Sequence, residues 1–321
     1  MTNQKPITPD AKRLETLETA FKEFRLYFSE EKSSAKKWLL FKHQFRKYYF
    51  MLPPIWRVAL RIPSWKKRIP FDFVSTGAVR SGTSSLSSYI FQHPCVVLPL
   101  AKEILTWHKT SILMAQLPHK KEKKKILNRY GAALCGTGTP VVPSMAWPHV
   151  AQSINPDLKI VIILRNPTQR VISQWRWDRM VGKQLFSDPL TKFFPDFDDH
   201  MLEEIANHKY GNGFSLISGA VKHSYLANSI YLPFIKKVRA IFGEENIKII
   251  CAEEFFKNPL PIVKNVYSFL GLPEYDPIEI KETNPSFPVT ISDDTVSKIS
   301  EFFRPLNDEL YEYLDKDLGW E

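Results

Sequence analysis

The feature that most constrains the fold is an apolar run of strand length that leads through a glycine-containing loop into a helix. Residues 71–76 predict a short buried strand, residues 77–83 contain two glycines, and residues 84–92 predict a helix. This order is the building unit of parallel α/β sheets. The N–H groups and the positive dipole end at the start of a helix also make such a loop a binding site for an anion.

Further strands and helices alternate along the chain. Residues 96–98, 159–164 and 246–251 predict strands, whereas the segment after Thr168 and residues 260–270 predict helices. Strands separated by helices indicate a mostly parallel sheet with right-handed crossovers. We therefore expect an α/β fold of three layers, in which a central, mostly parallel β-sheet is flanked by helices.

The net charge of +10 belongs to the first part of the chain. Residues 1–70 contain 16 Lys or Arg and 6 Asp or Glu, whereas residues 71–321 contain 28 of each sign. Residues 11–50 have helical periodicity, and a group of prolines then marks a boundary near residue 70. We expect a basic N-terminal helical extension over residues 1–70 and a catalytic domain over residues 71–321.

Two interpretations of the extension stay open. Its mixture of aromatic and basic residues fits peripheral contact with an anionic membrane, and it equally fits helices that pack on the domain with Lys and Arg pointing outward. Dimerisation or a lid function are further alternatives, and the sequence leaves the oligomeric state undetermined. A charge run over residues 120–125 predicts the solvated face of a helix.

Localisation follows from what the sequence lacks. It contains no run of about 18 uncharged apolar residues, so we expect no transmembrane segment. The first ten residues are polar and have no apolar signal core. Three widely spaced cysteines, without metal-ligand spacing, favour a reducing compartment. We therefore expect a cytoplasmic protein, with no nucleic-acid partner.

The first loop has the spacing of a Walker A motif without its lysine. Gly77 and Gly82 frame it, and Thr83 occupies the lysine position. Nucleoside-triphosphate enzymes rely on that lysine and on Mg²⁺ near an acidic residue, whereas the strand over residues 159–164 ends in Arg165. The loop is therefore P-loop-like, yet a kinase or ATPase is disfavoured. A glycine- and serine-rich turn without any ligand is the simpler alternative.

A second loop, residues 165–173, also joins a strand to a helix. Arg165 leaves the strand end toward the crevice where open α/β sheets bind ligands, and Ser173 lies two turns along the helix. Arg170 is either a ligand or a structural ion-pair partner. Two anion-binding loops on neighbouring strands suggest a ligand with two separated phosphates.

Taken in order, these loops resemble those of the sulfotransferases that use 3′-phosphoadenosine-5′-phosphosulfate (PAPS), especially the heparan sulfate and carbohydrate branch with its bacterial relatives. The family's K/R-x-G-T loop appears as Arg80-Ser81-Gly82-Thr83, and its R-[DN]-P-x-x-R-x-x-S stretch runs from Arg165 to Ser173. The likeness covers residues 72–320. It is supported by five further segments: His93-Pro94, Lys102-Glu103, a Gly-x-x-Thr-Pro turn at 136–140, residues 253–272 and the closing Gly319-Trp320.

The resemblance implies how the donor is held. The residues expected to bind the 5′-phosphosulfate are Arg80, Ser81, Gly82, Thr83, Ser84 and Ser85. Arg165 and Ser173 are expected to bind the 3′-phosphate. The family more often has Lys at the position of Arg80, and its heparan branch often has a basic residue at that of Ser84.

The resemblance also implies the catalytic groups. Arg80 and Lys102 would neutralise charge on the leaving group, and Glu103 would act as general base, with His108 as its rival. Side-chain cations can replace a metal in this reaction, so we expect no metal requirement. The family's E-x-H-F-F stretch has lost its histidine here, which affects acceptor contacts.

The acceptor is less constrained than the donor. A hydroxyl on a carbohydrate or a small metabolite is the first hypothesis, and N-sulfation of an amine or guanidinium is an alternative. A polyanionic glycan fits poorly with the electrically neutral residues 71–321. Tyr225 is a candidate acceptor contact, and Trp175 and Trp177 are candidates for base stacking or for the core. A membrane- or polyanion-binding module without catalysis is the non-enzymatic alternative.

Overall fold

The computed structural model describes residues 53, 55–104, 107, 109–140, 147–186, 196–209, 225–278 and 289–320. Within these residues, five parallel strands form one sheet in the order β2-β3-β1-β4-β5. The strands are β1 (Phe73–Gly77), β2 (Val96–Val97), β3 (Leu134–Gly138), β4 (Lys159–Leu164) and β5 (Ile247–Cys251). The prediction of a parallel α/β sheet is therefore confirmed.

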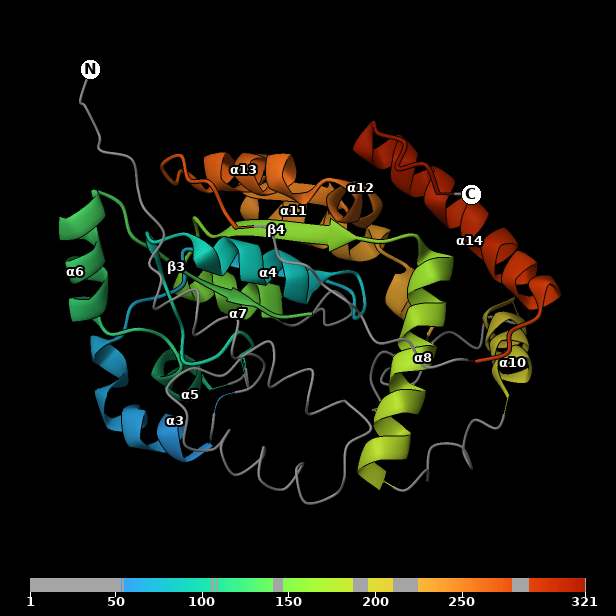
Figure 1. The fold of residues 1–321 in the computed structure, drawn as a ribbon, viewed down its shortest axis with the longest axis horizontal. Helices are drawn as coiled ribbons and strands as arrows, with labels where there is room; N and C mark the ends of the chain where they lie inside the picture. Colours follow the sequence, from blue (N-terminus) through green and yellow to red (C-terminus); the bar gives the residue numbers. More distant parts are fainter. Residues whose placement is uncertain are drawn as a thin grey trace.

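Helices surround this sheet (Figure 1). In chain order they are α3 (Ile55–Arg61), α4 (Thr83–Gln92), α5 (Thr110–Ala115), α6 (Lys120–Tyr130), α7 (Trp147–Ile154), α8 (Pro167–Phe186), α10 (Phe197–Lys209), α11 (Leu232–Phe242), α12 (Ala252–Lys257), α13 (Pro259–Leu270) and α14 (Asp293–Leu314). Short 3₁₀ turns are η1 (Ile62–Lys67), η3 (Ala227–Ser229) and η4 (Glu244–Asn246).

Alternate side chains of the central strands separate the core into two layers. Phe73 of β1 and Ile163 of β4 belong to an apolar cluster with α4 and α13. Val74 and Ile162, the next residues along, belong to a second cluster with α7 and α11. This division is the period of two that a strand imposes on its side chains. A sheet buried on both faces between helices gives the three layers that the sequence predicts.

Strand β3 corrects one expectation. Residues 136–140 were expected to form a turn, whereas Gly136 and Gly138 lie in β3, between β2 and β1. A Cβ at Gly136 would lie 2.2 Å from the Phe73 ring, and one at Gly138 would lie 2.0 Å from Ser87 Oγ. The glycines therefore allow neighbouring side chains to approach the strand, a use of glycine in strands that a turn signature conceals.

The parallel strands give the molecule two distinct ends, one at their carboxyl ends and one at their amino ends. β4 points toward α8, which follows it, and α8, α10 and α14 lie together at that end (Figure 1). The third apolar cluster, which includes Trp175 and Phe303, holds these helices together. At the opposite end lie α3, η1, α5 and α6, before the first residues of β1 and β3.

Only the last part of the expected N-terminal extension falls within the described residues. Val58 of α3 packs against Leu100 and Ala115, and an isolated bridge joins Arg68 to His119. The boundary near residue 70 stays a prediction. The charge run at residues 120–125 lies in α6, as predicted. In the described part of the chain, no helix is both long and apolar enough to cross a membrane.

Candidate functional site

The first loop turns sharply from β1 into α4. Arg80 has φ 71° and Gly82 has φ 95°, so two residues of the turn adopt the left-handed region. For Gly82 this conformation is easily reached, whereas for Arg80 it is strained and marks a site that its surroundings hold in place. Gly82 is the N-cap of α4, which begins at Thr83. The first N–H groups of α4 therefore point outward at the carboxyl end of β1, in the geometry that binds oxyanions.

The second loop lies directly beside the first because β4 pairs with β1. Gly77, the last residue of β1, is opposite Ile163 of β4. Nη1 of Arg165 donates a hydrogen bond to the Arg80 carbonyl at 3.0 Å, and Nε of Arg80 donates to Oγ of Ser173 at 3.3 Å. Residues that are about 85 positions apart in the sequence thus form one basic cluster, because their loops follow neighbouring strands, as predicted.

Two aromatic rings flank the guanidinium groups of this cluster. The Trp177 ring centroid lies 4.5 Å from Cζ of Arg80, and the Phe256 ring centroid lies 5.9 Å from Cζ of Arg165. A Cβ at Gly82 would lie 2.8 Å from the Phe256 ring, so that ring covers the loop itself. The sequence analysis identified Trp177 as a candidate for stacking. It did not identify Phe256, because the position of this ring depends on how α12 packs near the start of α4.

Arg165 is held from two further directions. The buried Tyr231 hydroxyl donates to the Arg165 carbonyl at 2.8 Å, and burial raises the pKa of this phenol. Burial lowers the pKa of the Arg165 guanidinium, and the carboxylate of Glu253 acts in the opposite direction. A partly buried cation that lacks full hydration gains strongly from an anionic ligand, which is the environment that a phosphate site requires.

Glu253 braces the second loop. Its Oε1 accepts from the backbone N–H of Asn166 at 2.9 Å, and its Oε2 accepts from the Trp320 indole at 3.0 Å and from the Cys251 thiol at 3.2 Å. The sequence showed Glu253 and Trp320 as landmarks of the resemblance without a role. Their hydrogen bond shows that the C-terminal Gly-Trp segment fixes the loop that carries Arg165.

Arg170 has a structural function. Its side chain is fully buried and donates to the Val79 carbonyl at 3.2 Å, to the Tyr225 carbonyl and to the Ser229 hydroxyl. These acceptors are uncharged, so the ion-pair interpretation is not supported by them. Because Val79 lies in the first loop and Arg170 in the helix after the second, this residue ties the two loops together.

The Lys102–Glu103 pair lies near the same end of the sheet. Nζ of Lys102 is 2.7 Å from Oε1 of Glu103, and the two side chains are 1% and 13% exposed. The end of β3 holds the pair in position, because Oγ1 of Thr137 and the N–H of Gly138 donate to the Lys102 carbonyl at 2.6 and 2.9 Å. A buried ammonium that pairs with a slightly exposed carboxylate at the end of β3 differs from a surface ion pair.

The remaining candidates divide into three groups. Ser81, Thr83 and Ser85 are buried in the first loop and the start of α4, and Ser84 is half-buried there. Tyr225 is buried beside Trp175, with ring centroids 5.2 Å apart, a position typical of the core; its contact with an acceptor stays a prediction. His108 lies outside the described residues.

A family model described as a sulfotransferase domain matches residues 71–304. The chain is 22% identical over 320 residues to the membrane-associated sulfotransferase kil1 of Dictyostelium discoideum, across 78% of this chain and 66% of that protein. It is 24% identical over 305 residues to the bifunctional heparan sulfate N-deacetylase/N-sulfotransferase 1 of Caenorhabditis briggsae, across 86% of this chain and 32% of that protein.

The chain therefore spans about two thirds of the first curated relative and about one third of the second. Among solved structures, the crystal structure of a sulfotransferase from Alicyclobacillus acidocaldarius is similar, with a TM-score of 0.53 and 21% identity. That match covers 77% of this chain and 96% of the other, and it shows that the two share a fold.

Proposed function

The chain belongs to the sulfotransferase family, and from that premise we propose that it transfers the sulfuryl group of PAPS to an acceptor hydroxyl, producing PAP (the desulfated nucleotide) and a sulfate ester. One observation carries the proposal: Arg80, Arg165 and Ser173 converge at the start of α4, where two loops meet. Such a cluster fits a nucleotide with two separated phosphate groups better than it fits a single anion.

In this proposal the two loops divide the nucleotide between them. The backbone N–H groups at the start of α4, with Arg80 and the hydroxyls of Thr83 and Ser84, hold the 5′-phosphosulfate. Arg165 and Ser173 hold the 3′-phosphate. Support comes from two hydrogen bonds between the loops, which join Arg80 to Ser173 and Arg165 to the Arg80 carbonyl.

The transfer itself is an in-line displacement. The acceptor oxygen forms a bond to sulfur while the bond from sulfur to the bridging phosphate oxygen breaks, and negative charge develops on that bridging oxygen. Arg80 and Lys102 would neutralise this charge. Glu103 would accept the acceptor proton, and its contact with Lys102 holds it in a defined orientation. Because these are side-chain cations, the proposal includes no metal.

The nature of the acceptor is part of the proposal. A hydroxyl on a carbohydrate or small metabolite is favoured, since Lys102 and Glu103 compensate each other and residues 71–321 carry no net charge. N-sulfation of an amine or guanidinium is the alternative, and a carboxylate at Glu103 would suit a cationic acceptor. A transfer screen with labelled PAPS across sugars, alcohols and amines, with products identified by mass, separates these.

We also propose that the protein acts in the cytoplasm, as the sequence predicts. The three cysteines, Cys95, Cys135 and Cys251, are unbonded and buried. Burial raises the pKa of the Cys135 and Cys251 thiols, which lowers their reactivity. The absence of a disulfide among these residues fits a reducing compartment.

The donor site is tested by titration with PAP. Arg165→Ala is expected to weaken PAP binding about a hundredfold, because a charge-assisted phosphate contact is lost. Arg304→Ala, at an exposed position of α14, is the matched control and should bind PAP as the unmodified chain does. Failure of the unmodified chain to bind PAP would contradict the proposal, as would equal affinity in the two variants. Dependence of binding on Mg²⁺ and ATP would favour the kinase alternative.

The brace formed by Glu253 gives a second prediction. Trp320→Phe keeps an aromatic ring, but it removes the indole N–H from which Glu253 accepts and part of the buried ring volume. We expect the free energy of unfolding to fall by about 1 kcal/mol. If this loss of stability loosens the second loop, which carries Arg165, PAP binding weakens about fivefold.

The control for this change is Trp65→Phe, on the 3₁₀ turn η1 at the other end of the molecule. It should leave PAP affinity unchanged in the same isothermal titration. Unaltered PAP affinity in Trp320→Phe would show that the brace contributes to folding and not to the site.

A further inference from the structure

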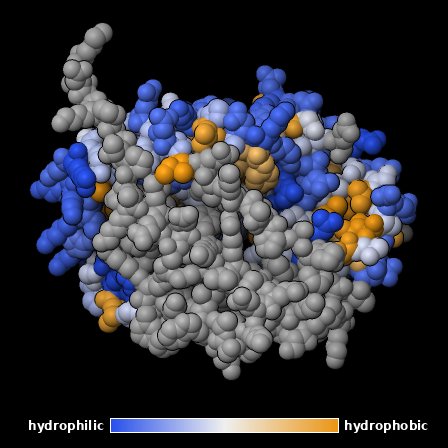
Figure 2. All heavy atoms as spheres, viewed as in Figure 1, coloured by the Kyte–Doolittle hydropathy of each residue, from blue (hydrophilic) through white to orange (hydrophobic). Residues whose placement is uncertain are grey.

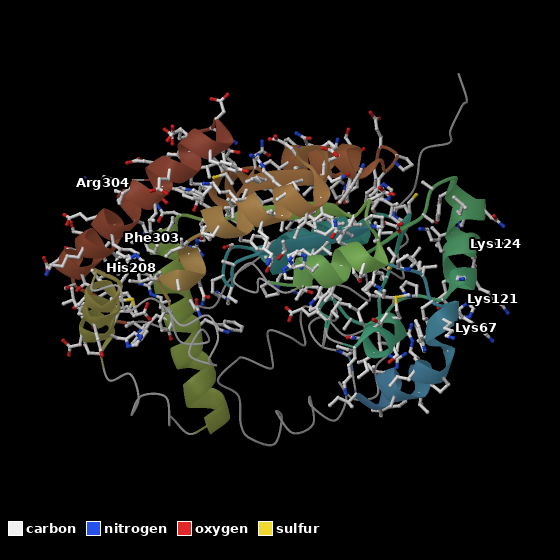
Figure 3. All side chains as sticks on the ribbon, turned by 180° about the vertical axis from the view of Figure 1, so that it is seen from behind. Lys67, Lys121, Lys124, His208, Phe303 and Arg304 are labelled. Carbon is white, nitrogen blue, oxygen red and sulfur yellow. The ribbon has the colours of Figure 1, made fainter. Side chains whose placement is uncertain are left out.

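The end of the molecule opposite the nucleotide loops is strongly basic. Residues 55–68 and helix α6 together contain eleven Lys or Arg and one acidic residue, Glu122. Lys67, Lys121 and Lys124 project from this end, far from Arg304 at the other (Figure 3). We name the surface of α3, η1 and α6 the basic face.

The two carboxylates described near the basic face, Glu122 and Asp72, already have hydrogen-bond or ion-pair partners. Glu122 accepts from the backbone N–H of His119 at 3.2 Å in the N-terminal cap of α6, and Asp72 pairs with Lys123 at 2.9 Å. The exposed lysines that surround these pairs are Lys66, Lys67, Lys120, Lys121, Lys124 and Lys125.

The concentration of lysines destabilises helix α6. Lys120 and Lys124, and likewise Lys121 and Lys125, are like charges spaced four apart, which destabilises an isolated helix. Part of the positive charge is also turned inward: the pKa of Arg61 is lowered to about 10, first by burial and then by repulsion from Arg68. A surface that faces only water does not require such an excess of positive charge. The arrangement therefore indicates an anionic partner.

Large apolar side chains are exposed on the same face. Ile55 is 75% exposed and Leu60 72% exposed, and Trp56 is 43% exposed. Helix α3 turns only Val58 fully inward, so its larger apolar side chains face outward. Leu127 of α6 adds a fourth at 46%. Figure 2 shows apolar atoms beside strongly hydrophilic ones at this edge of the molecule.

From this combination we propose that the basic face docks on an anionic lipid surface. Cationic side chains attract the headgroups, and the strongly exposed Ile55 and Leu60 enter the boundary between headgroups and acyl chains. A nucleic acid or anionic glycan would contact the lysines and would not account for the exposure of Ile55 and Leu60.

The position of the face separates docking from catalysis. Helix α6 precedes β3 and η1 precedes β1, whereas the nucleotide loops follow the carboxyl ends of β1 and β4. The donor site therefore lies at the other end of the sheet from the docking surface. The inference does not depend on the proposed enzymatic function.

The experiment is vesicle flotation with the full chain. Phosphatidylcholine vesicles with about one third phosphatidylserine should bind it, and phosphatidylcholine vesicles should not. Lys121→Glu/Lys124→Glu is expected to weaken binding roughly a hundredfold, and Leu60→Ser about tenfold. Lys236→Glu/Arg304→Glu, at exposed positions away from the face, is the control of equal charge change and should retain most of the binding.

The outcomes decide between occupants. Equal flotation of all variants, or equal binding to both vesicles, would overturn the proposal. Heparin or RNA binding that falls in Lys121→Glu/Lys124→Glu and is unchanged in Leu60→Ser, without flotation, would assign the face to a polyanion. A drop in unfolding free energy in Leu60→Ser, without any change in flotation, would mean that the chain itself covers the face. PAP affinity should be unchanged in every variant, so a failed docking test leaves the donor site intact.

Discussion

Replacing Glu103 by Gln is expected to lower the rate of sulfuryl transfer about a thousandfold while PAP affinity stays nearly unchanged. The amide keeps the size of the carboxylate and its acceptor oxygen for Lys102, which lies 2.7 Å from Oε1 of Glu103. What it loses is the capacity to take a proton from the acceptor hydroxyl. The measurement is the turnover number with labelled PAPS beside a PAP titration of the same preparation.

The matched control is Glu301→Gln, at an exposed position of α14, which should transfer at the unmodified rate. Substantial turnover in Glu103→Gln would move the general base elsewhere, and His108 is then the first candidate. A parallel loss of PAP affinity would instead mean that the Lys102–Glu103 pair belongs to the donor site.

The second large effect is on stability. Arg170→Met should lower the free energy of unfolding by about 3–5 kcal/mol, because several buried acceptors lose their donor at once. Methionine fills much of the volume but offers no hydrogen to the carbonyls of Val79 and Tyr225 or to the hydroxyl of Ser229. Denaturant unfolding measures the loss, with Arg304→Met as an exposed control that changes stability by less than about 0.5 kcal/mol.

A loss below about 1 kcal/mol in Arg170→Met would show that water or neighbouring donors satisfy these acceptors. The same variant tests whether the two loops are coupled. Because Arg170 joins the helix after the second loop to the Val79 carbonyl in the first, PAP binding should also weaken in the fraction that remains folded.

The parts of the fold predicted from sequence are those with a strong local pattern. The β-branched run at β4 and the strand–loop–helix unit at β1 and α4 appear at their predicted positions within one or two residues. Both strands are short apolar runs of strand length, one rich in β-branched residues and the other ended by a glycine-containing loop. Strand β3 was missed, since its two glycines are determined by Phe73 and Ser87 on other elements and not by the local chain.

The candidate site divides in the same way. Arg80, Arg165 and Ser173 could be named from the sequence because each lies in a loop or helix that follows a predicted strand, and because these segments resemble the sulfotransferase motifs. The supporting residues could not. Glu253 is linked to Trp320 across 67 positions, and Tyr231 to Arg165 across 66, contacts that no spacing rule indicates. The acceptor contact at Tyr225 stays a prediction, since its buried ring lies beside Trp175 in the core.

The hydrogen bond between Trp320 and Glu253 also bears on how the protein is synthesised. A ribosome releases the first loop of β1 long before it reaches residue 320, so a nascent chain holds an unbraced second loop until then. The second loop therefore gains this bracing contact only after Trp320 has left the ribosome. A chain that stalls during translation would carry both arginine loops and still lack the contact that fixes one of them.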